Sequence, residues 1–455
     1  MKYSEAMTLT TQPDPAPDTA PPQITRRVVL KAAAVGGIVT GFPMIIPASA
    51  FGANDRIVYG HIGVGGMGSS HIVADSCAAL CDVDKNHLAD AAKKVQGKPL
   101  LTDDYRRVLD RKDIDAVTIG TPDHWHALMA VHACQAGKDV YSEKPTCKTL
   151  NEGLAMVAAA RRHGRVVQIG AQGRSNPRAA AACNYIRNGQ IGAVTRVDMW
   201  HPNNFVTGSG FAPIGPPPPE LNWEMWLGPL AWRPYDPDTV HFNFRWMMDS
   251  GAGFIRDRGN HAMSVVLWCL GQDGYSDPVR VEATGETNPL RVYDAPLTMR
   301  VKWTFTRPDW TLTWNQPGVP NPRFPGEWGA TYTGTKDDLV VTGGDGGCDT
   351  EKKAVEYTPP ATGFSAFLEP TDTDPTERHR RNWRRCIKTR ERPVMDVEIG
   401  VKVIALPIIA NIAYRLGRPL TFDPKTWRFI GDAEANRFVD EPYRQPWNLG
   451  GVAAV

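Results

Sequence analysis

The sequence predicts an α/β fold that opens with a doubly wound parallel sheet. Apolar segments of strand length alternate with segments in which apolar residues recur every three or four positions, as a helix requires. The strand segments include "DRIVYGHI", "AALCDVD", "DIDAVTIG" and "DVYSEKP", and the clearest helix is "HALMAVHACQAGK". Ligands of such sheets bind at the carboxyl ends of the strands. The segments "TPDHWH" and "EKP" follow two of these strands and are therefore candidates for a binding site.

A glycine-rich turn, "GVGGMG", follows the first strand. Gly63, Gly65 and Gly68 fit the pattern G-x-G-x-x-G. These glycines allow a tight turn, a close backbone approach to a pyrophosphate and close packing of a helix on the strand. We expect a helix to start here and its N–H groups to hold the phosphates, with Gly66 and Met67 contributing to this contact.

Asp82 ends the second strand, 19 residues after Gly63. A carboxylate at this place accepts hydrogen bonds from the ribose hydroxyls of adenosine and repels a 2′-phosphate. We therefore predict a dinucleotide site that prefers NAD to NADP. Asp84 is either a solvated neighbour or shares the role of Asp82.

The first fifty residues differ from the rest in composition. Arg26 and Arg27 precede an apolar run from Ala32 to Ile46, and the small residues Ala48-Ser49-Ala50 follow. A basic segment, an apolar core shorter than the ~20 residues of a membrane span and an A-x-A site indicate a removable signal peptide. "TRRVVLK" resembles the twin-arginine export signal. We predict that residues 1–50 are removed and that the mature chain is exported to the periplasm; a retained amphipathic or membrane anchor is the alternative.

The remaining chain is too long for one ordinary core, so we predict two domains, residues 51–172 and 173–455. The formal net charge of the chain is +2 and no basic run dominates, so nucleic acid is not expected as a partner. The eight cysteines include no C-x-x-C pair, and no metal site is predicted. Most of these cysteines are expected in the core, and a disulfide stays open because its pairing cannot be read from the sequence.

Several of these segments together identify a family resemblance. "GVGGMG", "CDVD", "TPDHWHA", "AGKDVYSEKP" and "GAQGRS" closely resemble the glucose–fructose oxidoreductase and inositol dehydrogenase family, called Gfo/Idh/MocA. The later segments "NWEMWLGP" and "AYRLGRPL" resemble its exported members. The resemblance implies a Rossmann domain followed by an α/β domain with a large, mostly antiparallel open sheet. The sequence agrees, because "GAVTRVDMW", "VRVEATGE", "LTMRVKWTF", "DWTLTWNQ", "ATYTGT" and "DLVVTGG" read as strands.

The resemblance also implies a catalytic set of Lys144, Asp257 and His261. In the family, the lysine of E-K-P lies beside the nicotinamide and the substrate hydroxyl. His261 corresponds to the general base, for which a pKa near neutrality is suitable, and Asp257 to its partner one helical turn earlier. Without the resemblance, Asp257 would be read as a helix cap and His261 as a core histidine. Ala262 stands where many exported relatives have a second histidine, so any role of that histidine, including metal binding, is in doubt.

Further candidates rank below this set. For the cofactor they are Thr121, Pro122, His126 and Glu143, although His126 could equally be a packing residue. For the substrate they are Gln172, Arg174 and Arg245.

The resemblance implies an NAD(P)-dependent oxidoreductase that acts on CH–OH donors of a sugar, polyol or sugar derivative, and a homo-oligomer. Export adds a constraint, because the periplasm has no replenished nicotinamide pool. The cofactor must therefore stay tightly bound and be regenerated in place. Two alternatives remain open. One is an NAD-dependent glycosidase that uses transient sugar oxidation, although "DRGNHAM" differs from the corresponding "Y-P-T-H-G"-like stretch. The other is a catalytically silent sugar-binding protein.

Overall fold

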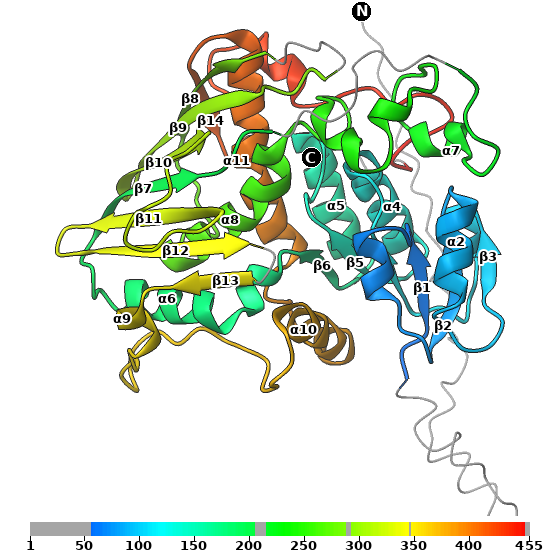
Figure 1. Ribbon diagram of the computed structural model, residues 1–455, viewed down its shortest axis with the longest axis horizontal. Helices are drawn as coiled ribbons and strands as arrows, with labels where there is room; N and C mark the ends of the chain where they lie inside the picture. Colours follow the sequence, from blue (N-terminus) through cyan, green and yellow to red (C-terminus); the bar gives the residue numbers. More distant parts are fainter. Residues whose placement is uncertain (1–55, 205–214, 288–292, 345–346, 451–455) are drawn as a thin grey trace, which may run out of the picture. The chain divides into compact units, whose positions relative to one another are not determined.

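The computed structural model describes residues 56–204, 215–287, 293–344 and 347–450. The predicted signal peptide, residues 1–50, lies outside these ranges. The described chain contains two sheets, one of six strands and one of nine (Figure 1).

The first sheet is parallel throughout and has the strand order β3-β2-β1-β4-β5-β6. Its strands are β1 (Tyr59–Ile62), β2 (Cys77–Cys81), β3 (Leu100–Thr102), β4 (Ala116–Ile119), β5 (Asp139–Glu143) and β6 (Val167–Gly170). All four residues of β1, β4 and β6 are buried, as in a sheet covered on both faces. The order reverses between β1 and β4, which places the expected binding crevice at the carboxyl ends of these two strands. The predicted Rossmann arrangement is confirmed.

Four helices follow strands of this sheet: α2 (Lys85–Ala92), α3 (Tyr105–Leu109), α4 (Asp123–Gln135) and α5 (Leu150–Arg162). Local sequence explains their ends. Thr149 and Glu152 form a capping box at the start of α5, and Gly137 adopts a φ of 78° just after α4, as a left-handed helix end requires.

The helix predicted after the glycine turn is the exception. It is a five-residue 3₁₀ helix, η3 (Met67–His71). The chain has only residues 72–76 left before β2 begins, which leaves no room for a longer helix and a return loop. The phosphate-binding turn therefore lacks the long helix that usually follows it.

The second sheet has the order β13-β12-β11-β7-β10-β9-β8-β14-β15. Its strands are β7 (Val194–Trp200), β8 (Val279–Glu286), β9 (Thr298–Thr306), β10 (Asp309–Gln316), β11 (Trp328–Gly334), β12 (Asp338–Gly344), β13 (Gly347–Thr350), β14 (Leu420–Asp423) and β15 (Arg428–Phe429). Neighbours pair antiparallel except β7 with β10. The predicted, mostly antiparallel sheet is confirmed. Burial alternates along β9 and β10, so one face of the sheet covers the core and the other is more exposed.

The remaining helices belong to the later part of the chain. They are η4 (Gln172–Ser175), α6 (Pro177–Arg187), α7 (Trp223–Leu227), η5 (Pro237–Thr239), η6 (His241–Trp246), α8 (Phe254–Leu270), α9 (Lys352–Val355), α10 (Pro375–Thr389), α11 (Val397–Leu416) and η7 (Ala435–Phe438). In Figure 1, α8 and α11 lie between the two sheets, and α11 contacts both α5 and β8. Within the described ranges, α11 is the one helix long and apolar enough to cross a membrane. Because 78% of its apolar window is buried inside the protein, α11 fits the role of a core helix.

Segments late in the sequence return to the first sheet. Trp383 of α10 packs against Tyr59 and Tyr141, and Trp447 packs edge-on against Trp125. One large hydrophobic core, which includes Trp125 and Trp447, extends across the two sheets, and Trp383, Tyr59 and Tyr141 form a smaller cluster of their own. All eight cysteines lie in the described ranges and are free, and seven are buried, as expected of core residues.

Buried histidines make a pH-dependent contribution to stability. Burial lowers the pKa to about 3 for His61 and His124 and to about 4 for His379. In the unfolded chain these groups take up protons near pH 6.5, whereas the folded protein leaves them neutral. Unfolding therefore binds protons between pH 6.5 and 4, and the free energy of unfolding falls as the pH falls through this window. Asp123 has the opposite effect, because burial raises its pKa to about 7. Below that pH the folded protein holds one proton that the unfolded chain binds only at lower pH, which favours the folded state.

We expect the free energy of unfolding to be lower at pH 5 than at pH 7, measured by urea denaturation at both values. His124→Gln should reduce this slope by up to about 1.4 kcal/mol per pH unit, since it removes one of the titrating groups. A stability that does not change between pH 7 and 5, or an unaltered slope in H124Q, would contradict this account.

Candidate active site

A cavity of about 580 Å³ lies at the carboxyl ends of the strands of the first sheet. This volume is within the ~300–1,000 Å³ typical of small-molecule sites. The cavity is continuous from Asp82 and Asp84 beside β2 to Lys144 after β5 and His261 on α8. Many of the predicted site residues line it: Gly63, Gly65, Gly66, Met67, Asp82, Thr121, Pro122, Glu143, Lys144, Arg245, Asp257 and His261.

The glycine turn has the geometry that nucleotide binding requires. Gly63 has a φ of +72°, and a Cβ built on Gly68 would lie 1.8 Å from the carbonyl oxygen of Gly63. Gly68 therefore lets η3 pack on the turn and does not itself line the cavity. A Cβ at Gly66 would meet nothing within 4 Å, so backbone at this point is open to a ligand. These residues fit a pyrophosphate held by backbone, although the short η3 adds less helix dipole than a full helix would.

Asp82 holds the turn in place. Its Oδ2 accepts hydrogen bonds from the backbone N–H groups of Val64 (2.8 Å) and Gly65 (3.2 Å), and its Oδ1 accepts from the N–H of Asp84 (2.9 Å). Oδ1 also lies 3.7 Å from Nδ1 of His87. The two carboxylates of Asp82 and Asp84 thus give this end of the cavity a negative character, which suits ribose hydroxyls and disfavours a 2′-phosphate.

At the opposite end, Asp257 is shared by two cations. The ammonium of Lys144 contacts its Oδ1, and Nε of Arg245 lies 3.1 Å from its Oδ2. Side chains of Asp257 and Lys144 are only 9% and 12% exposed. Burial alone would raise the pKa of Asp257, but Lys144 and Arg245 hold it well below its usual range. The carboxylate is therefore ionised and fixes the position of the lysine ammonium in the cavity.

His261 lies one helical turn after Asp257 on α8 and lines the same cavity. Burial and the nearby Lys144 ammonium lower the pKa of His261 to about 3. The imidazole is consequently neutral at neutral pH, and its lowered pKa makes it a weaker base than the near-neutral value expected from the sequence. The start of α8 is fixed by Asn204, whose Oδ1 accepts a hydrogen bond from the N–H of Phe254 (2.9 Å).

Glu143 is the centre of a buried hydrogen-bond network behind Lys144. Its Oε1 accepts from Nε2 of His71 (2.9 Å) and from Nε2 of Gln172 (3.0 Å). Burial favours the neutral acid, but the hydrogen bond from His71 and the nearby charge of Lys144 lower the pKa of Glu143 to about 2. Nδ1 of His71 lies 3.3 Å from Nη1 of Arg380, which can only donate. His71 therefore accepts at Nδ1 and donates from Nε2 to Glu143.

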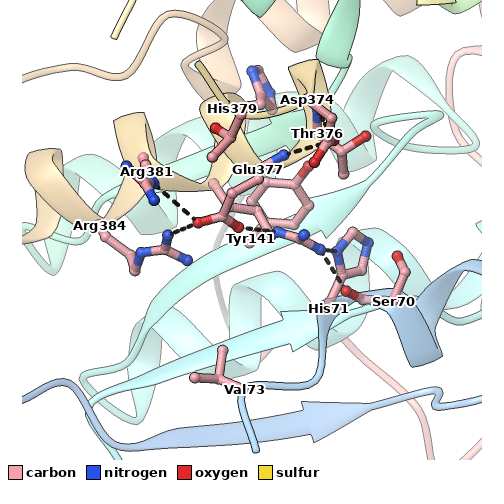
Figure 2. Close-up of polar contacts among 12 residues, drawn as sticks. Ser70, His71, Val73, Tyr141, Asp374, Thr376, Glu377, His379, Arg381 and Arg384 are labelled. Carbon is pink, nitrogen blue, oxygen red and sulfur yellow. Dashed lines mark hydrogen bonds and ion pairs between the residues drawn. The ribbon is translucent and has the colours of Figure 1, made fainter. Parts of the chain in front are cut away.

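This network extends to α10. The carboxylate of Glu377 accepts hydrogen bonds from Arg380, Arg381 and Arg384, as Figure 2 shows for the last two. The labelled His71 and Ser70 lie across from Glu377 in the same view. A helix from the later part of the chain thus fixes the orientation of Glu143 through His71.

The structure corrects the placement of three candidates, which do not line the cavity. Gln172 donates to Glu143 and to the Tyr141 hydroxyl, so its amide is used within the protein. Arg174 forms an ion pair with Asp273 and donates a hydrogen bond to the carbonyl of Ser264 (2.8 Å). Its side chain is therefore packed against α8. Substrate contact is therefore not the role that this geometry gives to either residue.

His126 is the third of these candidates. Its ring nitrogens lie 2.7 Å from the carbonyl oxygen of Pro145 and 2.8 Å from that of Thr121. The ring joins the segments that follow β4 and β5, and it is fully buried. His126 therefore positions the residues that line the cavity and does not reach the cavity itself.

Several lining residues were not predicted. Asp123 lines the cavity directly after Pro122, and burial raises its pKa to about 7. Its place in "TPD" at a strand end was a usable signal. Trp226 stacks on Trp223 and lines the cavity together with Phe242 and Phe244. No spacing in the sequence ties these aromatic residues to the strand ends.

Comparisons with known proteins agree with this fold. The model for the oxidoreductase family with an NAD-binding Rossmann fold matches residues 57–171. The model for the oxidoreductase family's C-terminal alpha/beta domain matches residues 192–309 and 366–449. The two models together cover more than half of the chain.

Individual relatives match over shorter stretches. A levoglucosan dehydrogenase of Pseudarthrobacter phenanthrenivorans is 32% identical over 149 residues, which is 30% of this chain and 38% of that protein. A glycosyl hydrolase family 109 protein of Shewanella pealeana is 32% identical over 155 residues, which is 31% of this chain and 32% of that protein. The chain thus matches less than half the length of these curated relatives.

A solved structure extends the likeness to most of the fold. The aldose-aldose oxidoreductase from Caulobacter crescentus superposes with a TM-score of 0.55, at 20% identity, over 80% of this chain and 99% of that one. At this identity the likeness concerns the fold alone. With both family models matched in order along the chain, this protein belongs to the Gfo/Idh/MocA oxidoreductase family, which joins an NAD-binding Rossmann domain to a C-terminal α/β domain.

Proposed function

We propose that this protein is an NAD-dependent oxidoreductase acting on a CH–OH group of a sugar, polyol or sugar derivative. The observation that carries the proposal is the meeting of Lys144, Asp257 and His261 in the cavity that begins at the glycine turn. A levoglucosan dehydrogenase among the relatives supports the substrate class. When bound, NAD supplies the acceptor for a hydride from the substrate carbon.

The side chains divide the work at the substrate hydroxyl. The Lys144 ammonium, fixed by Asp257, binds the substrate oxygen and stabilises the negative charge that develops on it. The neutral imidazole of His261 accepts the hydroxyl proton. Asp257 keeps Lys144 and Arg245 in place and compensates their charge.

The preference for NAD over NADP follows from the charges at the end of the cavity opposite Lys144. Asp82 and Asp84 lie there, and no lysine or arginine is among the residues that line this end in the described chain. A 2′-phosphate would meet two carboxylates and no lysine or arginine side chain there, which is unfavourable.

Export through the twin-arginine route is part of the proposal and rests on the sequence of residues 1–50. That route carries folded proteins, so the cofactor can be loaded before export and remain bound. Three reactions meet this condition: transfer between two sugars, a redox-neutral cycle, and electron transfer to an external acceptor. We further expect a homo-oligomer, with the more exposed face of the nine-stranded sheet as the surface that pairs subunits.

An NAD-dependent glycosidase is the second candidate, and the glycosyl hydrolase family 109 relative favours it. The two functions differ in their products. Transient oxidation followed by bond cleavage releases an aglycone with no net NADH, whereas a dehydrogenase or a transfer between sugars leaves the glycosidic bond intact.

The retained cofactor gives a prediction about the purified protein. The full chain purified without added nucleotide and then heat-denatured should release about one equivalent of NAD or NADH, identified by mass spectrometry. Tight retention is expected because the nucleotide must survive export without a pool to replace it. A protein that is isolated empty but binds added NAD weakly would contradict the retained cofactor and leave an ordinary dehydrogenase.

Lys144→Ala should lower turnover of the accepted substrate by about 10²–10⁴-fold, since it removes the group that binds the reacting oxygen. Nucleotide content should remain near that of the wild type, because the glycine turn and Asp82 are unchanged. Lys98→Ala, at an exposed position, is the matched control and should retain full activity. Full turnover in K144A would refute the assigned role.

The pH dependence of kcat/KM tests His261. Because burial and Lys144 lower its pKa to about 3, the imidazole remains an acceptor well below pH 6.5. We expect kcat/KM to show no loss through pH 6.5 that is attributable to His261, and His261→Asn to lower it by about 10²–10⁴-fold at every pH. An acid limb near pH 7 that disappears in Asp123→Asn would instead assign the proton transfer to Asp123.

A further inference from the structure

A second group of polar side chains lies at the end of the cavity away from Lys144. Asp84, His87 and His241 each offer one ligand atom, and these atoms lie within 4.8 Å of one another. Asp84 caps the start of α2, His87 follows in its first turn, and His241 begins η6. The third residue comes from a distant part of the chain, so no spacing in the sequence predicts the group.

The carboxylate of Asp84 is oriented for a further contact. Its Oδ1 accepts a hydrogen bond from the N–H of Asn86 (2.8 Å), which leaves Oδ2 facing Nε2 of His241 at 3.4 Å. In a tetrahedral zinc site with bonds of ~2.0–2.1 Å, neighbouring ligand atoms lie about 3.4 Å apart. This pair already has that separation, and the rings of His87 and His241 are tilted by 59° with centroids 5.0 Å apart.

Backbone contacts hold the two sides of the group together without using the three side chains. The N–H of Asn222 donates to the carbonyl of Val83 (2.9 Å), and the N–H of Lys85 donates to the carbonyl of Glu220 (3.0 Å). The side-chain amide of Asn222 also donates to Asp103 (2.9 Å). The start of the segment that leads to His241 is thereby anchored beside α2.

The geometry points to a divalent transition-metal site of the zinc class formed by Asp84, His87 and His241. Two imidazoles and one carboxylate suit zinc and its first-row neighbours, whereas magnesium and calcium prefer oxygen ligands alone. Three protein ligands leave one position open toward the cavity, for water or another ligand. The Asp82 carboxylate, 3.7 Å from His87, adds negative charge that favours the cation. This site goes beyond the proposed oxidoreductase function, and it shares Asp84 and this end of the cavity with the proposed nucleotide site.

Zinc titration of the full chain tests the site. The protein is stripped with a chelator, dialysed and titrated with ZnCl₂, and the bound metal is measured by calorimetry and elemental analysis. We expect one tight equivalent, weakened by at least about 100-fold in His241→Asn and in His87→Gln, since each removes a direct ligand. His163→Gln, at the end of α5 and outside the group, is the control and should bind zinc like the wild type.

Cobalt substitution of the wild-type chain is the second readout and does not depend on the folding of any variant. Co²⁺ should give visible bands of a low-coordinate nitrogen and oxygen site, without the near-ultraviolet absorption of a cobalt–thiolate bond. That thiolate absorption would assign the metal to cysteines and overturn the proposal. Zinc binding that is unchanged in both H241N and H87Q, or the absence of tight binding in the wild type, would overturn it as well.

Discussion

The ion pair between Lys144 and Asp257 connects the two parts of the fold at the catalytic end of the cavity. Lys144 follows β5 of the first sheet, and Asp257 lies in the first turn of α8, which belongs to the second domain. Both side chains are nearly buried, and an uncompensated buried charge costs about 3–5 kcal/mol. Arg245 adds a second cation on the same carboxylate. The same ion pair therefore holds the two domains together and fixes the position of the Lys144 ammonium.

The surrounding structure keeps this pair in register. Arg174 fixes α8 from behind through Ser264, and His126 joins the segments after β4 and β5. Glu143, next to Lys144, is oriented by His71, which in turn contacts α10. Residues from five separate stretches of the chain thus support the Lys144–Asp257 pair, and none of these supporting residues needs to touch a substrate.

The sequence predicted most of the fold because its signals are local. Strand and helix periodicity identified the parallel sheet, and the strand ends pointed to Lys144 and the glycine turn. Apart from the helix after the glycine turn, which is shortened by the chain available before β2, what failed depended on partners distant in the chain. Arg174 is polar and stands near a strand end, yet its partner Asp273 lies 99 residues later and turns it away from the cavity. His241 meets Asp84 only because the intervening loop returns to α2, which no pattern in the sequence reveals.

The segment from residue 215 to residue 246 links the two ends of the cavity. It supplies His241 opposite Asp84 at one end and Arg245 to Asp257 at the other, with Trp226 lining the space between. Its backbone hydrogen bonds to Val83 and Lys85 hold it against the first domain. If release of a bound nucleotide requires this segment to lift, the same movement withdraws Arg245 from Asp257. Retention of a cofactor and the position of the Asp257 carboxylate would then depend on one segment.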